Sequence, residues 1–156
     1  ESVLQFGATT GAPDPNALKG RLVAQISEFW RCIALTPVAI GRNELLVSLF
    51  GITIEYNILA DVIISGYGIP RDSGVKRLNP FLPEALRAEI EEAVNLDGLT
   101  AASLIRTNFA LSRIMQEEGR KIASQQGFEY PAAVEGAALD YTRQELALLG
   151  YAELVG

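Results

Sequence analysis

Residues 78–131, LNPFLPEALRAEIEEAVNLDGLTAASLIRTNFALSRIMQEEGRKIASQQGFEYP, decide the fold class of this chain. They contain two successive amphipathic patterns with recognisable helix start signals. Pro83 precedes Glu84, so a helix can begin there with the proline in its first turn, where a missing N–H costs nothing. Thr100 can cap the next helix, which continues without proline to Gly127, a residue type that commonly ends helices. The segment predicts helices and carries almost no catalytic chemistry.

The rest of the chain continues in the same style. Pro37 is expected to kink the first helix or to end it near Thr36, because proline cannot donate a backbone hydrogen bond. Asn43 is expected to cap the second helix, which ends at Gly66. The five expected helices cover about residues 16–40, 44–65, 83–94, 100–126 and 131–149.

These helices predict an all-α fold, an antiparallel bundle of about four long helices and one short one. Residues 3–6 alternate in polarity and could form one short strand. A linker rich in glycine, alanine, threonine and proline follows it. We therefore divide the chain into an N-terminal strand and linker, residues 1–15, and a helical bundle domain, residues 16–156.

Composition excludes some classes of function. The chain has 156 residues, 49% of them hydrophobic and 21% charged, which is typical of a globular core. Its net charge is −6, whereas nucleic-acid binding normally requires a basic face, so we expect no nucleic-acid partner. The absence of histidine from the sequence excludes Ser-His and Cys-His catalysis and His-ligated zinc sites.

The cellular compartment is predicted from cysteine usage. Cys32 is the only cysteine, so no internal disulfide can form, and a reducing, cytoplasmic location is expected. The surrounding apolar residues favour a buried, inert thiol over a nucleophile. Residues 45–65 are the longest apolar stretch, but Glu55, Asn57 and Asp61 interrupt them, so we expect no membrane span.

The second helix is apolar almost all round, which predicts a buried position at the centre of the bundle. Two polar lines interrupt its apolar surface: Glu44, Ser48, Gly51 and Glu55 on one face, and Thr53, Asn57, Asp61 and Ser65 on another. A buried carboxylate is costly unless it is paired or faces a wet cleft. Glu55 and Asp61 therefore either find partners inside the bundle or line a ligand cleft. We favour a functional Glu55, because Ser48 and Gly51 leave room beside it, and a structural Asp61.

The fourth helix combines a core stripe with a line of arginines. Leu104, Asn108, Leu111, Met115 and Ile122 should face the core. Arg106, Arg113 and Arg120 recur every seven residues. Glu117, four residues after Arg113 and four before Lys121, is expected to form ordinary surface pairs with them. The single tryptophan, Trp30, is expected to be a packing anchor or, as the alternative, a stacking platform for a ligand.

No motif indicates catalysis. The glycines of residues 66–70, GYGIP, lack the strand and helix that flank them in a dinucleotide site. No Gly-Ser turn precedes a pair of carboxylates on a strand, so two-metal nucleotidyl transfer has no visible site. We expect the chain alone to be catalytically inactive.

One resemblance points to a function. Residues 77–94 and 96–146 resemble the helical C-terminal domain of bacterial antibiotic nucleotidyltransferase-like proteins, the lincosamide and aminoglycoside adenylyltransferases and their relatives. The EFW stretch at 28–30, the IGRNELL stretch at 40–46 and the GFEYP turn at 127–131 are similar to motifs of that family. Residues 2–6 resemble the strand that precedes this domain.

The resemblance implies a substrate-binding domain that forms the wall of an acceptor site. In that family an N-terminal catalytic domain holds ATP and Mg²⁺; this chain lacks its motif and so needs no cofactor of its own. The implied ligand is a small molecule that bears hydroxyl groups and can be cationic. Glu55, Asn57 and Asp61 would line its site, with Glu28 and Trp30 opposite, and Lys76 and Arg77 would lie near the nucleotide phosphates.

Two other functions stay open. The chain could be a helical module that forms a homodimer or binds a partner subunit, as in nucleotidyltransferase-associated systems of the toxin–antitoxin type. It could also be a regulatory helical domain related to neither. A Gly-Ser motif followed by paired aspartates, encoded upstream of residue 1, would favour the substrate-binding domain.

Overall fold

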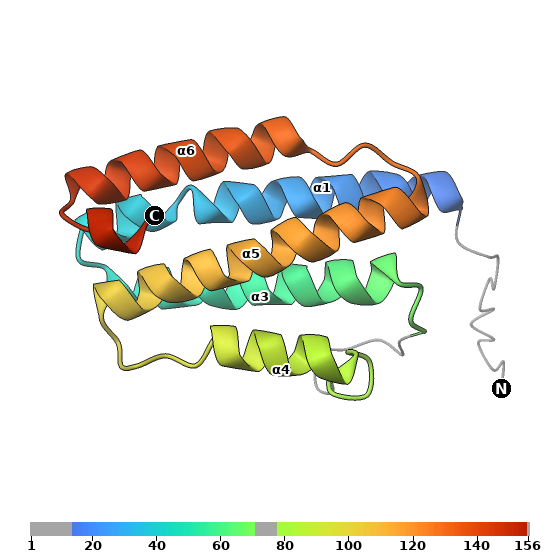
Figure 1. Cartoon of the computed structure of the whole chain (residues 1–156), viewed down its shortest axis with the longest axis horizontal. Coiled ribbons are helices and arrows are strands. Elements are labelled where there is room, and N and C mark those ends of the chain that lie inside the picture. The colour runs from blue at the N-terminus through green and yellow to red at the C-terminus, as the bar shows by residue number, and fades with distance from the viewer. Residues whose placement is uncertain (1–13, 71–77, 156) are drawn as a thin grey trace, which may run out of the picture.

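The computed structural model describes residues 14–70 and 78–155, which form one helical bundle (Figure 1). The elements in chain order are α1 (Pro15–Ile33), α2 (Thr36–Gly41), α3 (Leu45–Gly66), α4 (Glu84–Ala93), α5 (Ala101–Gln126), α6 (Ala132–Leu148) and the 3₁₀ helix η1 (Ala152–Leu154). Within these residues no strand occurs, so the all-α prediction is confirmed. The expected strand at residues 3–6 lies outside the described residues.

The helices α1, α3, α4, α5 and α6 alternate in direction along the chain (Figure 1). Because α4 lies between α3 and α5 in sequence, α3 and α5 run in the same direction. The helices α1 and α6 both run in the opposite direction. The figure shows α6 on one flank and α4 on the other, with α1, α3 and α5 between them. The four long helices and the short α4 correspond to the expected helices, and α2 is an additional short one. Because α3 packs against α5 and α1 against α6 in parallel, the bundle is not antiparallel throughout, contrary to the expectation.

Capping residues explain several helix ends. The Asp14 side chain accepts a hydrogen bond from the backbone N–H of Asn16 at 3.0 Å, and Thr100 Oγ1 accepts one from Ser103 N at 3.1 Å. Gly127 ends α5 with a left-handed φ of 68°. Such a φ is strained in a residue with a side chain, so glycine is favoured there.

One expected helix break is confirmed and one expected cap is wrong. The helix expected over residues 16–40 is interrupted close to Thr36, as predicted: α1 ends at Ile33, and α2 begins at Thr36. Pro37 lies in the first turn of α2, where it fits without losing a hydrogen bond. Asn43 is not the cap of α3: it has a positive φ of 57°, and Glu44 occupies the cap position. Asparagine tolerates the left-handed region, which suits this tight turn.

The core follows the predicted stripe on α5 and includes Trp30 of α1. All five expected stripe residues of α5 are buried. Trp30 is fully buried and packs edge-on against Phe29, with ring centroids 5.1 Å apart, and its Nε1 donates to Tyr130 Oη at 2.9 Å. The packing-anchor interpretation of Trp30 agrees with this environment.

The apolar surface of α3 is only partly covered. By length and composition alone α3 could cross a membrane, but a core helix of a bundle passes the same test. In the bundle α3 packs against α1 and α5, and Leu59, Val62 and Ile63 are fully buried. Its first two turns, however, expose Leu46 and Phe50 to 71% and 65%. Burial all round, as expected from the sequence, therefore fails at this end.

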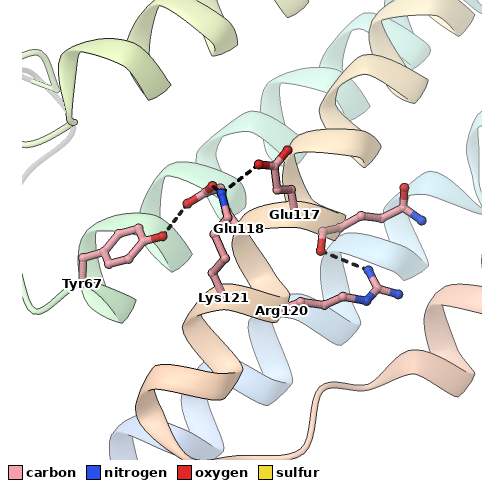
Figure 2. A network of polar contacts seen from close by, with 6 residues as sticks. Tyr67, Glu117, Glu118, Arg120 and Lys121 are labelled. Atoms are coloured by element: carbon pink, nitrogen blue, oxygen red, sulfur yellow. Dashed lines mark hydrogen bonds and ion pairs between the residues drawn. The ribbon is translucent and has the colours of Figure 1, made fainter.

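Polar contacts secure the other end of α3 to α5 (Figure 2). Tyr67 Oη donates to Glu118 Oε2 at 2.5 Å, and Lys121 Nζ donates to Glu118 at 2.8 Å and to Glu117 at 2.7 Å. The expected pairing of Glu117 with Lys121 is confirmed. Arg113 forms no ion pair with Glu117 in the described part of the chain, so that pairing was wrong.

Candidate functional site

A cavity of about 190 Å³ lies where α1, α2 and α3 meet, and we call it the Glu55 cavity. It is reached past apolar side chains and has polar groups from all three helices in its wall. The lining residues are Glu28, Arg31, Cys32, Leu35, Thr36, Ala39, Val47, Ser48, Phe50, Gly51, Ile54 and Glu55.

One predicted polar line of α3 forms a wall of this cavity. Ser48, Gly51 and Glu55 are spaced three, four and seven residues apart, which places them on one face of a helix. All three line the cavity, whereas Glu44 lies exposed at the helix start. A side chain added at Gly51 would begin 4.0 Å from Glu55 Oε1. Glycine at this position therefore keeps the space beside the carboxyl group open.

Glu55 is 1% exposed and is held by Asn108 of α5. Asn108 Nδ2 donates to both carboxyl oxygens at 3.1 Å, and it also donates to Thr36 Oγ1 at 2.9 Å. The amide thus joins α2, α3 and α5 at one point. These bonds orient the carboxyl group but supply no opposite charge.

Burial raises the pKa of Glu55 to about 8, although the hydrogen bond from Asn108 acts in the other direction. At neutral pH most of the population is therefore protonated when the cavity is empty. A carboxyl group with a pKa displaced this far, at the wall of a cavity, is typical of a functional site.

Burial, and to a smaller extent the nearby carboxyl groups of Glu28 and Glu55, raise the pKa of the neighbouring thiol, Cys32, to about 11. The thiol consequently stays protonated at neutral pH. Because the thiolate is the nucleophilic form, this cysteine is inert, as the apolar sequence around it predicts.

The Ser48 hydroxyl is a second buried polar group in the cavity wall. Ser48 is 5% exposed, and its Oγ has no hydrogen-bond partner among the described residues. Leaving a buried hydroxyl unpaired costs about 1–3 kcal/mol. A ligand that bonds to this oxygen would recover that cost.

The cavity mouth combines an ion pair with apolar side chains. Arg31 Nε donates to Glu28 Oε2 at 2.7 Å, and its second nitrogen reaches the other oxygen at 2.5 Å. The hydrogen bond from Arg31 lowers the pKa of Glu28, so this carboxyl group is charged at neutral pH. Leu35, Val47 and Phe50 line the cavity and are at least half exposed.

Of the predicted site residues that the structure describes, it brings together only two, Glu28 and Glu55. Trp30 lies in the core and does not line the cavity. Asn57 donates from Nδ2 to the backbone oxygen of Thr53 at 2.7 Å, and Asp61 is half-buried; neither lines the cavity. Lys76 and Arg77 lie outside the described residues.

Asn108 and Thr36 belong to the site, and the sequence reasoning assigned neither to it. Asn108 was placed correctly on the core stripe of α5, where a carboxamide among leucines needs a polar partner. A polar amide on an apolar stripe is thus a sequence signal for a buried polar site. Thr36 carried no comparable signal, because its position depends on the break between α1 and α2.

The described residues contain no group of three or more histidine, cysteine or acidic side chains that could hold a metal ion. Comparison of the chain with protein-family models, with known proteins and with solved structures gives no match. A function for the Glu55 cavity therefore has to be argued from its chemistry.

Proposed function

We propose that this chain is a substrate-binding domain that holds a small cationic, hydroxyl-bearing molecule in the Glu55 cavity. The observation that carries the proposal is that a buried carboxyl group and a buried hydroxyl with no partner among the described residues line the same cavity. In line with the family resemblance, the domain would form the acceptor wall of a nucleotidyltransferase-like protein.

A primary ammonium group suits this wall chemically. It offers three donors and one positive charge. Glu55 would give up its proton and accept from the ammonium, and Ser48 Oγ would accept a second bond. The resulting ion pair would lie in a region of low dielectric, where it is strong only if both partners are well bonded.

The cavity size limits how much of the ligand enters. Drug-sized ligands occupy about 300–1,000 Å³, whereas this cavity has about 190 Å³. One amino- and hydroxyl-bearing end of a larger molecule would fit inside. The remainder would lie over the apolar mouth formed by Leu35, Val47 and Phe50.

Nucleotide transfer itself would require a separate catalytic domain. In this proposal that domain binds ATP and Mg²⁺ and presents the nucleotide to the bound acceptor. Lys76 and Arg77 are proposed to lie near the phosphates. The chain alone would bind the acceptor without modifying it.

Calorimetric titration with ethanolamine tests the cavity. Ethanolamine carries an ammonium and a hydroxyl group, and ethylene glycol is a neutral control of similar size. We expect saturable binding of ethanolamine only, weakened by Glu55→Gln and unaffected by Glu129→Gln, which removes an exposed carboxylate elsewhere. Equal binding by the Glu55→Gln variant would contradict the proposal.

One observation favours a second function, a partner-binding module. Apolar side chains stay exposed on α2 and on the first turns of α3, namely Val38, Leu46, Val47 and Phe50. Such side chains can mark a protein interface. Light scattering on the pure chain would detect a homodimer, and Phe50→Ser should dissociate it if α3 forms the interface. A monomer at all concentrations would exclude the homodimer version.

A further inference from the structure

A second, larger hollow lies on another side of the bundle, between α4 and α5, and we call it the α4–α5 groove. Its volume is about 560 Å³, and it is open to solvent. The helix α4 packs against α5, and the groove is lined by the second half of α4 and the first half of α5. No residue of the Glu55 cavity lines this groove.

The α5 wall carries two arginines that have no partner among the described residues. Arg106 and Arg113 both line the groove and are exposed. Neither forms a hydrogen bond or ion pair with any described residue, whereas Arg120 on the same helix binds Glu135 at 2.9 Å. Arg106 and Arg113 lie two turns apart on one face, with the small residue Ala110 between them. Their guanidinium groups can therefore converge on one anionic group above Ala110.

The α4 wall carries the opposite charge. Glu89 and Glu92 line it, and Asp97 continues it beyond the end of the helix. Within residues 14–70 and 78–155 these carboxylates also have no ion-pair partner. Acidic and basic side chains thus face each other across the groove without meeting, which leaves room for a ligand between them.

From this arrangement we propose that the α4–α5 groove binds a zwitterionic small molecule, with its anionic group on Arg106 and Arg113 and its cationic group on Glu89 and Glu92. Guanidinium groups bind carboxylate or phosphate through paired hydrogen bonds. A purely anionic ligand would be repelled by the three carboxylates, and a purely cationic one by the two arginines. The groove volume lies within the range of about 300–1,000 Å³ that small-molecule sites occupy.

The probe for this site is 6-aminohexanoate, a linear zwitterion. Hexanoate carries only the anionic group and hexylamine only the cationic group. The three compounds therefore distinguish the contribution of the arginines on α5 from that of the carboxylates on α4. Binding is followed by NMR through the backbone amides of Ala110 on α5 and Ala93 on α4. We expect saturable chemical-shift changes of both amides with 6-aminohexanoate. Hexanoate and hexylamine should bind at least about fivefold more weakly, because each of them lacks one exposed ionic contact.

Charge-neutral variants complete the test. Arg106→Gln and Arg113→Gln should weaken the zwitterion about fivefold each, as should Glu92→Gln, while the exposed Arg21→Gln of α1 should leave it unchanged. Equal binding of hexanoate and 6-aminohexanoate would overturn the proposal, because the α4 wall would then be irrelevant. An absence of saturable shifts at Ala110 would overturn it as well. Neither result bears on the Glu55 cavity.

Discussion

At the scale of single residues, Glu55 is the most informative side chain in the protein. The sequence left two interpretations, a paired structural carboxyl group or a cleft wall. In the structure the side chain has both properties: Asn108 bonds to it, and the carboxyl group lines a cavity. Because Asn108 is neutral, the burial of Glu55 is not balanced by charge, and its pKa rises to about 8.

This pKa makes the stability of the protein depend on Glu55. The folded state binds the Glu55 proton more tightly than the unfolded state does, so stability falls as pH rises from about 4.5 to about 8 and the loss is complete above that range. We expect Glu55→Gln to remove this loss, because glutamine mimics the protonated form. Urea unfolding of both proteins at about pH 5, 7 and 9 measures it. Parallel pH dependences in the two proteins would contradict the raised pKa.

Asn108 should be important for stability as well as for the site. Asn108→Ala leaves Glu55 and Thr36 without their donor and opens a small void, so we expect a loss of about 1–3 kcal/mol in the free energy of unfolding. Ser112→Ala is the matched control: Ser112 is equally buried on α5 but bonds only to the backbone oxygen of Asn108. Similar losses in both variants would mean that the amide has no special role.

At the scale of elements, close approach of α3 and α5 decides how the bundle packs. The two helices meet at Gly66, where an added Cβ would lie 2.5 Å from Ile122 Cγ2. The same contact region contains the bond from Gln126 Nε2 to Gly66 O at 2.6 Å. The sequence predicts for Gly66 only that it ends a helix.

Glycine-to-alanine variants separate these roles. Gly66→Ala should cost about 1–3 kcal/mol, because it overpacks the contact with Ile122. Gly20→Ala, within α1 and with nothing within 4 Å of its Cβ, should instead stabilise the protein by about 0.5–1 kcal/mol through helix propensity. Ile122→Val in the Gly66→Ala background should recover part of the loss. Thermal unfolding of the variants provides the comparison, and a neutral Gly66→Ala would refute the close contact.

At the scale of the whole molecule, a second carboxyl group acts on stability in the opposite direction to Glu55. Glu135 of α6 is buried, which by itself would raise its pKa, but hydrogen bonds from Arg120, Tyr130 and Gln116 lower it overall. Ionised Glu135 therefore stabilises the fold above the ordinary glutamate pKa of about 4.5. This stabilisation is lost as pH falls through the lowered pKa of the folded state.

The two groups together predict a stability maximum in mildly acidic solution, with Glu135 limiting the acid side and Glu55 the alkaline side. We expect Glu135→Gln to reduce stability at neutral pH by about 1–3 kcal/mol, because Arg120 loses a buried partner while staying half exposed itself. Glu91→Gln breaks only the partly exposed pair with Arg87 and should change stability by less than about 0.5 kcal/mol. A pH series of unfolding curves that shows no acid loss attributable to Glu135 would contradict this account.

The sequence alone determined the helical class and several helix ends, because these depend on residues within a few positions of one another. Periodic apolar positions, the Thr100 cap and the left-handed Gly127 are all local features. The spacing of Ser48, Gly51 and Glu55 likewise places them on one face without knowledge of the neighbours.

Only the tertiary structure decided what those faces meet. Asn108 lies 53 positions from Glu55, and Tyr130 lies 100 positions from the Trp30 that bonds to it. The cavity, the pKa of Glu55 and the burial of Trp30 depend on such distant contacts. Burial and dielectric are properties of the space around a side chain, and that space is filled by helices whose relative positions no local pattern encodes.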